Sequence, residues 1–187
     1  NGVLVLAAAG NDGLNSPHYP AAFEECIAVS ATDSLDLPAY FTNYGDWVDV
    51  AAPGVNIYST MPTYDVTMND LGYTKNYAYM SGTSMACPMA AGVAALIWSQ
   101  YPEWTTAQVR FNLEYTSEDL GLPGYDQFYG HGRINAQNAV GQLQPLHDVA
   151  ISQLQNVEYH VVGGSSDFNI TVLNRGQSFV SDLQVEL

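Results

Sequence analysis

The stretch from Gly82 to Trp98 contains no charged residue and is the longest apolar segment of the chain. Its length lies at the lower limit for a membrane-spanning helix. Small polar residues and Pro88 crowd its beginning, and polar sequence resumes at Ser99. We therefore predict a buried core helix over about 84–101 and no membrane span. Pro88 is expected in the first turn, where a missing N–H costs little.

Three apolar runs precede this helix: VLVLAAAGN at 3–11, CIAVSATD at 26–33, and an extended stretch at 47–60 around Pro53-Gly54. Continuous apolar runs are typical of parallel strands buried on both faces. A second helix is expected after Thr105, a candidate cap, because Val109, Leu113 and Thr116 recur at helical spacing. Strands that alternate with helices predict an α/β layer structure with a parallel sheet.

The character of the sequence changes after Gln142. Pro145 lies in a linker-like turn, and VAISQL, FNITVLN and LQVEL then alternate with period two, separated by turn residues. We therefore expect two parts, an α/β domain over 1–141 and, over 142–187, a linker followed by the first strands of an incomplete antiparallel β-sandwich.

Composition excludes several classes of partner. The chain carries 19 Asp and Glu against 4 Lys and Arg, a formal charge of −15. Binding of nucleic acid or of an anionic membrane surface needs clustered positive charge, so neither is expected. Such acidity suits a protein in salty or extracellular water. Cys26 and Cys87 lie in apolar sequence without metal-binding spacing, which favours two buried free thiols over a disulfide.

In α/β folds, binding and catalytic residues usually lie at the carboxyl ends of strands and at the start of helices. Two polar residues of this chain are expected at such positions. They are Asn11 and Ser84. Taken alone, each has an ordinary structural interpretation, because Asn commonly forms turns after strands and Ser commonly caps helices. A serine hydroxyl is also a poor nucleophile until a neighbouring base takes its proton.

The combination of segments is more specific. AAAGN, ATD, AAPG and GTSMA-x-P follow one another in that order, and YPEWTTAQVRFNLEYT and YGHGRINAQNAV come after them. Over residues 1–141 the chain resembles the subtilisin-like serine peptidases, the subtilases, and matches the C-terminal half of their catalytic domain. The resemblance implies part of a three-layer α/β fold with a parallel sheet. By position, Ser84 would be the nucleophile, Asn11 and the Ser84 N–H would form the oxyanion hole, and Thr83 would support it.

The resemblance also implies positions for substrate binding. Ala8 and Gly10 match a wall of the pocket for the residue before the scissile bond, Asp12 its rim and His18 its floor, while Met80 would face the leaving-group side. The alternative is that Asp12 and His18 are ordinary exposed loop residues, since the loop before His18 is shorter than in the family.

No cofactor is required by this chemistry. Some subtilases hold a weak structural cation through loop carbonyls and one carboxylate. The matching groups are the carbonyls of Ala21, Phe23 and Cys26 with the carboxylate of Asp49, and oxygen ligands suit Ca²⁺ or Na⁺. The alternative is that Asp49 is an ordinary surface or turn residue.

Two departures from the family stand out. Met89 replaces the usual His after the proline, which should affect packing only. More importantly, the triad order Asp, His, Ser is incomplete, because neither the Asp nor the His motif occurs, and none of the histidines matches the base (His18, His131, His147, His160). We expect both to precede Asn1, which makes this chain an internal piece that is inactive alone.

Two classes of function remain open. The first is a secreted or cell-surface serine endopeptidase that cleaves peptide or protein substrates through an acyl-enzyme on Ser84. The second is a non-catalytic, subtilase-like binding scaffold. A sandwich at 146–187 would serve docking to substrate or to the cell surface. An α/β-hydrolase is disfavoured because Met-Ala, and not the x-Gly of a G-x-S-x-G elbow, follows Ser84.

Overall fold

The computed structural model describes residues 2–141, 149–155 and 169–174. The chain divides into two compact units, Asn1–Gln142 and Leu143–Leu187.

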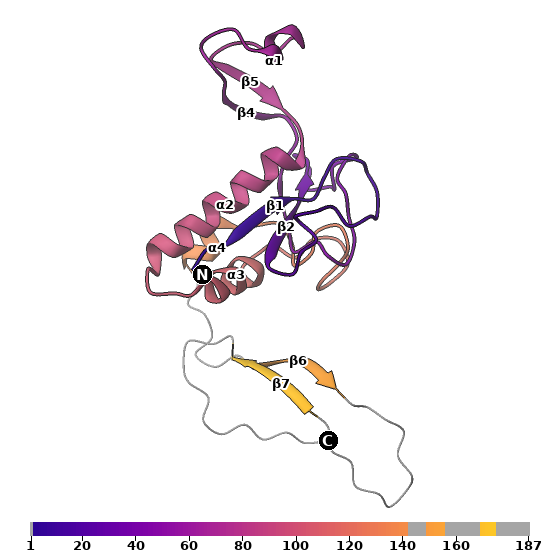
Figure 1. The fold of residues 1–187 in the computed structure, drawn as a ribbon, viewed down its shortest axis with the longest axis vertical. Coiled ribbons are helices and arrows are strands. Elements are labelled where there is room, and N and C mark those ends of the chain that lie inside the picture. Colours follow the sequence, from indigo (N-terminus) through magenta and orange to yellow (C-terminus); the bar gives the residue numbers. More distant parts are fainter. Residues whose placement is uncertain (1, 142–148, 156–168, 175–187) are drawn as a thin grey trace, which may run out of the picture. The chain divides into compact units, whose positions relative to one another are not determined.

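The first unit is built on a parallel sheet of three strands in the order β1-β2-β3 (Figure 1). They are β1 (Val5–Ala8), β2 (Cys26–Thr32) and β3 (Val50–Pro53). Every residue of the central strand β2 is buried, as its continuous apolar sequence predicts. The predicted α/β class with a parallel sheet is confirmed.

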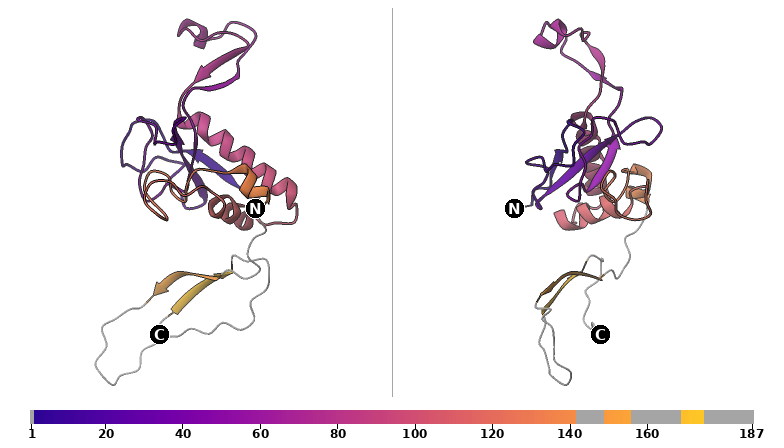
Figure 2. Two further views of the ribbon diagram at one scale, coloured as in Figure 1. Left: turned by 180° about the vertical axis from the view of Figure 1, so that it is seen from behind. Right: turned by 90° about the vertical axis from the view of Figure 1, so that its right-hand side faces the viewer.

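The extended stretch predicted over 47–60 is in fact two strands that belong to different sheets. β3 ends at Pro53, and β4 (Ile57–Thr60) pairs antiparallel with β5 (Tyr77–Met80). Gly54 lies between them and donates its N–H to the Thr32 carbonyl. The β4–β5 hairpin, with the short helix α1 (Thr67–Asp70) between its strands, projects from the sheet in both views of Figure 2. The prediction missed this break because an Ala-Pro-Gly turn interrupts an otherwise extended pattern.

Helix α2 (Thr83–Gln100) packs across the sheet and supplies much of the core. Its buried face follows helical spacing through small and branched residues (Ala86, Ala90, Val93, Ala94 and Ile97). This confirms the prediction of a buried core helix. Among the described helices, none is long and apolar enough to cross a bilayer.

The position of Pro88 differs from the prediction. The helix begins at Thr83, so Pro88 is its sixth residue and lies in the second turn rather than the first. A proline has no N–H for the carbonyl four residues earlier, which here belongs to Ser84. The Ser84 carbonyl therefore receives no helical hydrogen bond from that position.

Helix α3 (Thr106–Tyr115) is fixed by the predicted cap. The Thr105 hydroxyl accepts the Gln108 N–H at 3.3 Å, and the Gln108 side chain accepts the Thr105 N–H at 2.9 Å, which completes a capping box. Val109 and Leu113 are buried as their spacing predicts. The short helix α4 (Ala136–Gly141) adds Ala139 to the same core.

The second unit contains one described pair of antiparallel strands, β6 (Val149–Gln155) and β7 (Asn169–Asn174), with a register shift between Ile151 and Gln153. Antiparallel pairing is what the period-two pattern predicts. The third predicted run, LQVEL, lies outside the described residues, so the sandwich itself stays a prediction. In the first unit both cysteines are free, as predicted, with Cys26 buried and Cys87 only half-buried.

Replacing Thr105 by Ala removes the oxygen that caps α3 and should lower the free energy of unfolding by about 0.5–2 kcal/mol. Thr106→Ala is the matched control, because no hydrogen bond of the Thr106 hydroxyl occurs in the described residues, and its effect should stay within about 0.5 kcal/mol. Urea denaturation of the full-length protein and of both variants measures the difference. Equal effects of the two substitutions would contradict the capping role.

Candidate active site

Three chain segments meet at the N-terminus of α2. The loop after β1 carries Asn11, the turn after β3 carries Gly54, and α2 begins at Thr83. The Gly82 N–H donates to the Gly54 carbonyl at 2.8 Å, and the Gly10 N–H donates to the Thr83 hydroxyl at 3.1 Å. These two bonds seat the beginning of the helix against the carboxyl ends of β1 and β3.

The Asn11 amide is oriented by Thr83. Its Oδ1 accepts the Thr83 N–H at 2.8 Å and the Thr83 hydroxyl at 2.9 Å, and the Thr83 side chain is fully buried. Because this oxygen accepts two hydrogen bonds, the positions of the amide oxygen and nitrogen are fixed by their partners. The nitrogen Nδ2 is left as a donor. No partner of Nδ2 occurs in the described residues.

Ser84 is exposed and is the second residue of α2. The first N–H groups of a helix lack helical partners. Here the Thr83 N–H binds Asn11 and the Met85 N–H binds the Gly82 carbonyl, whereas the Ser84 N–H has no partner among the described residues. A Cβ placed on Gly82 would lie 3.6 Å from Asn11 Nδ2 and 3.7 Å from the Ser84 nitrogen. Two unused donors and one exposed hydroxyl therefore gather around Gly82.

A buried asparagine that the sequence analysis missed shapes the neighbouring loop. Asn43 Oδ1 accepts the N–H groups of Asp12 at 2.9 Å and Leu14 at 3.2 Å, and the Asn43 N–H donates to the Gly10 carbonyl at 2.9 Å. Gly10 has φ +101°, and a Cβ there would collide with the Asn43 amide. Nothing in the local sequence around Asn43 signals these contacts, since they join residues about thirty positions apart.

The predicted substrate-binding residues fall into two groups. Gly10, Asp12 and His18 lie together around Asn43, because the His18 ring is 3.1 Å from the Cβ position of Gly10 and the Asn43 amide reaches the Asp12 carboxylate at 3.5 Å. Asp12 and His18 are exposed, and half-buried Ala8 ends β1 beside them. Half-buried Met80 ends β5, opposite Ile57. Their roles toward substrate stay predictions.

No histidine of the described residues contacts Ser84. The His131 ring packs against Tyr125, and its Nε2 lies 3.9 Å from a carboxylate oxygen of Glu114 on α3. His18 lies by Gly10, and His147 and His160 lie outside the described residues. The described part of the chain thus presents an exposed serine hydroxyl and two unused N–H donors with no histidine in contact with the serine.

Two of the four groups predicted to hold a cation bind an arginine instead. Arg110 donates to the Cys26 carbonyl at 3.1 Å, the Glu24 carbonyl at 2.8 Å and Asp49 Oδ1 at 2.6 Å. Asp49 Oδ2 accepts the Ala28 N–H at 2.6 Å. Ca²⁺ or Na⁺ does not fit this arrangement, because the guanidinium uses the Cys26 carbonyl and the carboxylate and adds a positive charge there. The other two predicted ligands, the carbonyls of Ala21 and Phe23, would then have to bind a cation without the Cys26 carbonyl and without the Asp49 carboxylate.

Charge at this cluster is shaped by burial and by pairing. Burial raises the pKa of Asp49 above its ordinary value, although Arg110 and the Ala28 N–H both favour the carboxylate. Burial also opposes the charge on Arg110, but the carboxylates of Asp49 and Glu114 outweigh it and raise the pKa of the guanidinium. Burial and pairing therefore act in opposite directions on the charge of both groups.

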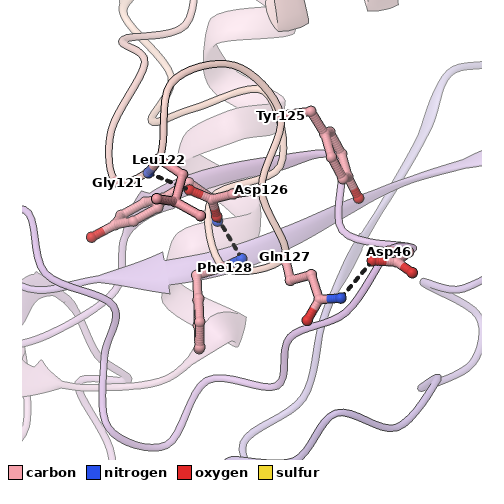
Figure 3. Close-up of a pocket in the computed structure, with 8 residues that line it drawn as sticks. Asp46, Gly121, Leu122, Tyr125, Asp126, Gln127 and Phe128 are labelled. Atoms are coloured by element: carbon pink, nitrogen blue, oxygen red, sulfur yellow. Dashed lines mark hydrogen bonds between the residues drawn. The ribbon is translucent and has the colours of Figure 1, made fainter.

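A cavity of about 600 Å³ is lined by Asp46 and by residues of the segment 121–129 (Figure 3). None of the residues around Ser84 lines it. Its lining contains no Ser, Cys, His or Lys. The Asp126 carboxylate accepts N–H groups of its own loop, and Asp46 accepts the Gln127 side chain at 2.7 Å. Burial and nearby carboxylates raise the pKa of Tyr125 to about 12, so its phenol keeps its proton at neutral pH.

We propose that Arg110 holds the loop over 21–26 in place of a cation. Arg110→Met keeps the length of the side chain but leaves the Asp49 carboxylate unpaired. It should lower the free energy of unfolding by about 1–3 kcal/mol, less than for a fully buried pair because both side chains are partly exposed. Chemical denaturation of the full-length protein measures this, and an unchanged midpoint would contradict the role of Arg110.

The same proposal predicts the response to calcium. Any rise in melting temperature that millimolar Ca²⁺ causes in the full-length protein should be the same in Asp49→Asn, because the carboxylate is already used by Arg110. Glu103→Gln, an exposed residue, is the matched control for loss of one negative charge. A calcium response that disappears only in Asp49→Asn would restore the predicted cation site.

Comparison with known proteins places this geometry in a family. A family model described as "Subtilase family" matches residues 1–132. The thermophilic serine proteinase of Bacillus sp. (strain AK1) is 46% identical over 139 residues, which are 74% of this chain and 31% of that protein. Subtilisin BL of Lederbergia lenta is 44% identical over 138 residues, 74% of this chain and 46% of that protein. This chain thus spans about a third to a half of these relatives.

Solved structures agree with the sequence comparison. The crystal structure of a lanthipeptide protease superimposes with a TM-score of 0.67 at 27% identity, over 75% of this chain and 50% of that one. Half of a protease chain therefore shares the fold described above, with the parallel sheet and the long helix that begins beside Ser84. The chain belongs to the subtilase family.

Proposed function

We propose that this chain carries the nucleophile and the oxyanion donors of a serine endopeptidase. One observation carries the proposal. Thr83 donates two hydrogen bonds to Asn11 Oδ1, so the amide nitrogen Nδ2 remains as a free donor beside the unused N–H of the exposed Ser84. A non-catalytic scaffold would have no need for an amide held in this one orientation.

The proposed chemistry follows from where charge develops. Attack of Ser84 Oγ on a peptide carbonyl forms the Oγ–C bond and moves negative charge onto the carbonyl oxygen. Asn11 Nδ2 and the Ser84 N–H would donate to that oxygen, and the N-terminal end of α2 adds positive potential. The general base that takes the Oγ proton during the attack gives it to the amine as the C–N bond breaks, and water then releases the acyl group from Ser84 as a carboxylic acid. Donors that are already oriented stabilise the transition state more than the substrate.

The general base and its carboxylate partner must come from elsewhere in the protein. We propose that sequence preceding Asn1 supplies them and also extends the sheet at β1. In the described residues β1 pairs only with β2, and Val3 and Val5 are 71% and 44% exposed at this edge. Residues 1–187 alone should not turn over substrate.

We further propose an extracellular or cell-surface location, which is consistent with the charge of −15. We also propose that the unit that follows Gln142 docks to substrate or to the cell surface.

Replacing Asn11 by Ala removes one oxyanion donor and leaves the nucleophile in place. In the full-length protein, kcat for a short chromogenic peptide should fall about 10²–10³-fold with little change in KM. That magnitude was measured on subtilisin itself and is borrowed from it. Asn15→Ala, an exposed asparagine of the same loop, is the matched control. Equal kcat values for Asn11→Ala and the unmodified protein would overturn the oxyanion role.

Thr83 is a positioning residue in this scheme, because it acts on the oxyanion through Asn11. Thr83→Ala removes one of two bonds to Asn11 Oδ1 and should lower kcat about five- to tenfold, whereas Thr83→Ser keeps the hydroxyl and most of the rate. In an Asn11→Ala background the Thr83→Ala change should have no further effect on kcat. Additive losses in the double variant would show that Thr83 acts independently of Asn11.

A further inference from the structure

The β4–β5 hairpin has two unlike faces. Its register places Tyr58 opposite Tyr79 and Thr60 opposite Tyr77, so these four residues share one face. The other face carries buried Ala78 with half-buried Ile57 and Met80, and also Ser59. The hairpin thus has one partly buried face and leaves the face of Tyr58, Thr60, Tyr77 and Tyr79, here called the tyrosine face, in solvent.

The rings of the tyrosine face form one continuous surface. The centroids of Tyr58 and Tyr79 lie 4.7 Å apart, and those of Tyr58 and Tyr77 lie 5.5 Å apart in a stacked arrangement. Each ring remains between 51% and 63% exposed. The face carries no charge, and the one ion pair of the hairpin, Lys75 with Asp65, lies outside it. Clustered exposed tyrosines are typical of contact surfaces, because each ring combines apolar area with a hydroxyl.

A short stretch of chain joins the hairpin to the candidate active site. β5 ends at Met80, and Gly82 and Thr83 then lead directly to Ser84. Figure 1 shows the hairpin rising from the N-terminal end of α2. Ser84 is five positions after Tyr79, and five extended residues span at most about 18 Å. A polypeptide held at Ser84 therefore reaches the tyrosine face with about five of its own extended residues, which a short peptide lacks.

We propose that the tyrosine face binds the polypeptide substrate at a distance from the scissile bond. The bound segment is uncharged and extended, with apolar side chains against the rings and main-chain polar groups at the phenol and Thr60 hydroxyls. The inference rests on the proposed endopeptidase function and deepens it: the enzyme selects long polypeptides over short peptides through this surface.

The test compares substrates of two lengths in the full-length protein. Tyr58→Thr with Tyr79→Thr removes two rings and keeps strand-forming residues. For a four-residue chromogenic peptide, kcat/KM should stay within about twofold of the unmodified protein. For an unfolded protein substrate, kcat/KM should fall about tenfold, mainly because KM rises, as expected for loss of two aromatic contacts. Tyr64→Thr, an exposed tyrosine of the same hairpin outside the tyrosine face, is the matched control and should change neither value.

Three results would overturn the proposal. They are equal losses on both substrates, no loss on the protein substrate, and a loss of equal size in Tyr64→Thr. If the double variant melts at a lower temperature than the unmodified protein, the single variant Tyr58→Thr is used, for which about a threefold loss on the protein substrate alone is expected. Absence of activity of the unmodified protein on the short peptide would instead reject the endopeptidase function itself.

Discussion

The double hydrogen bond from Thr83 to Asn11 Oδ1 is the interaction on which the candidate site depends. It joins the loop after β1 to the first residue of α2, and it also decides which end of the Asn11 amide faces outward. Thr83 is in turn fixed by the Gly10 N–H, and Gly10 by Asn43. The donors beside Ser84 are therefore oriented by buried groups before any substrate arrives, which is the condition for electrostatic stabilisation of a transition state.

The fold brings these groups together because α2 can lie close to the sheet. Its buried face is largely alanine, and Gly54 leaves room where the turn after β3 meets both Ala31 and the Gly82 carbonyl. Away from the site, Arg110 ties α3 to the loop before β2 and to Asp49 before β3. The same scaffold thus serves two purposes, with small residues where backbones meet and a charged pair where loops need support.

Sequence patterns predicted the strands β1 and β2, the core helix α2 and the cap of α3, because apolar runs and capping residues act over a few positions. They did not predict the separation of β3 from β4, since the Pro53-Gly54 turn sits inside an extended pattern. They also missed Asn43 and Arg110, whose contacts join residues about thirty to nearly ninety positions apart. Strand-end and helix-start positions identified Asn11 and Ser84 as candidates, but only the resemblance to subtilases implied that they act together, because local sequence carries no information on long-range contacts.

If Ser84 is an activated nucleophile, as proposed, covalent labelling should detect it directly. The full-length protein would be treated with a fluorophosphonate that reacts with activated serines, and the modified peptide would be located by mass spectrometry. The account predicts label on Ser84 that is abolished in Ser84→Ala. A folded full-length protein that remains unlabelled at Ser84 would contradict the account and favour a non-catalytic scaffold.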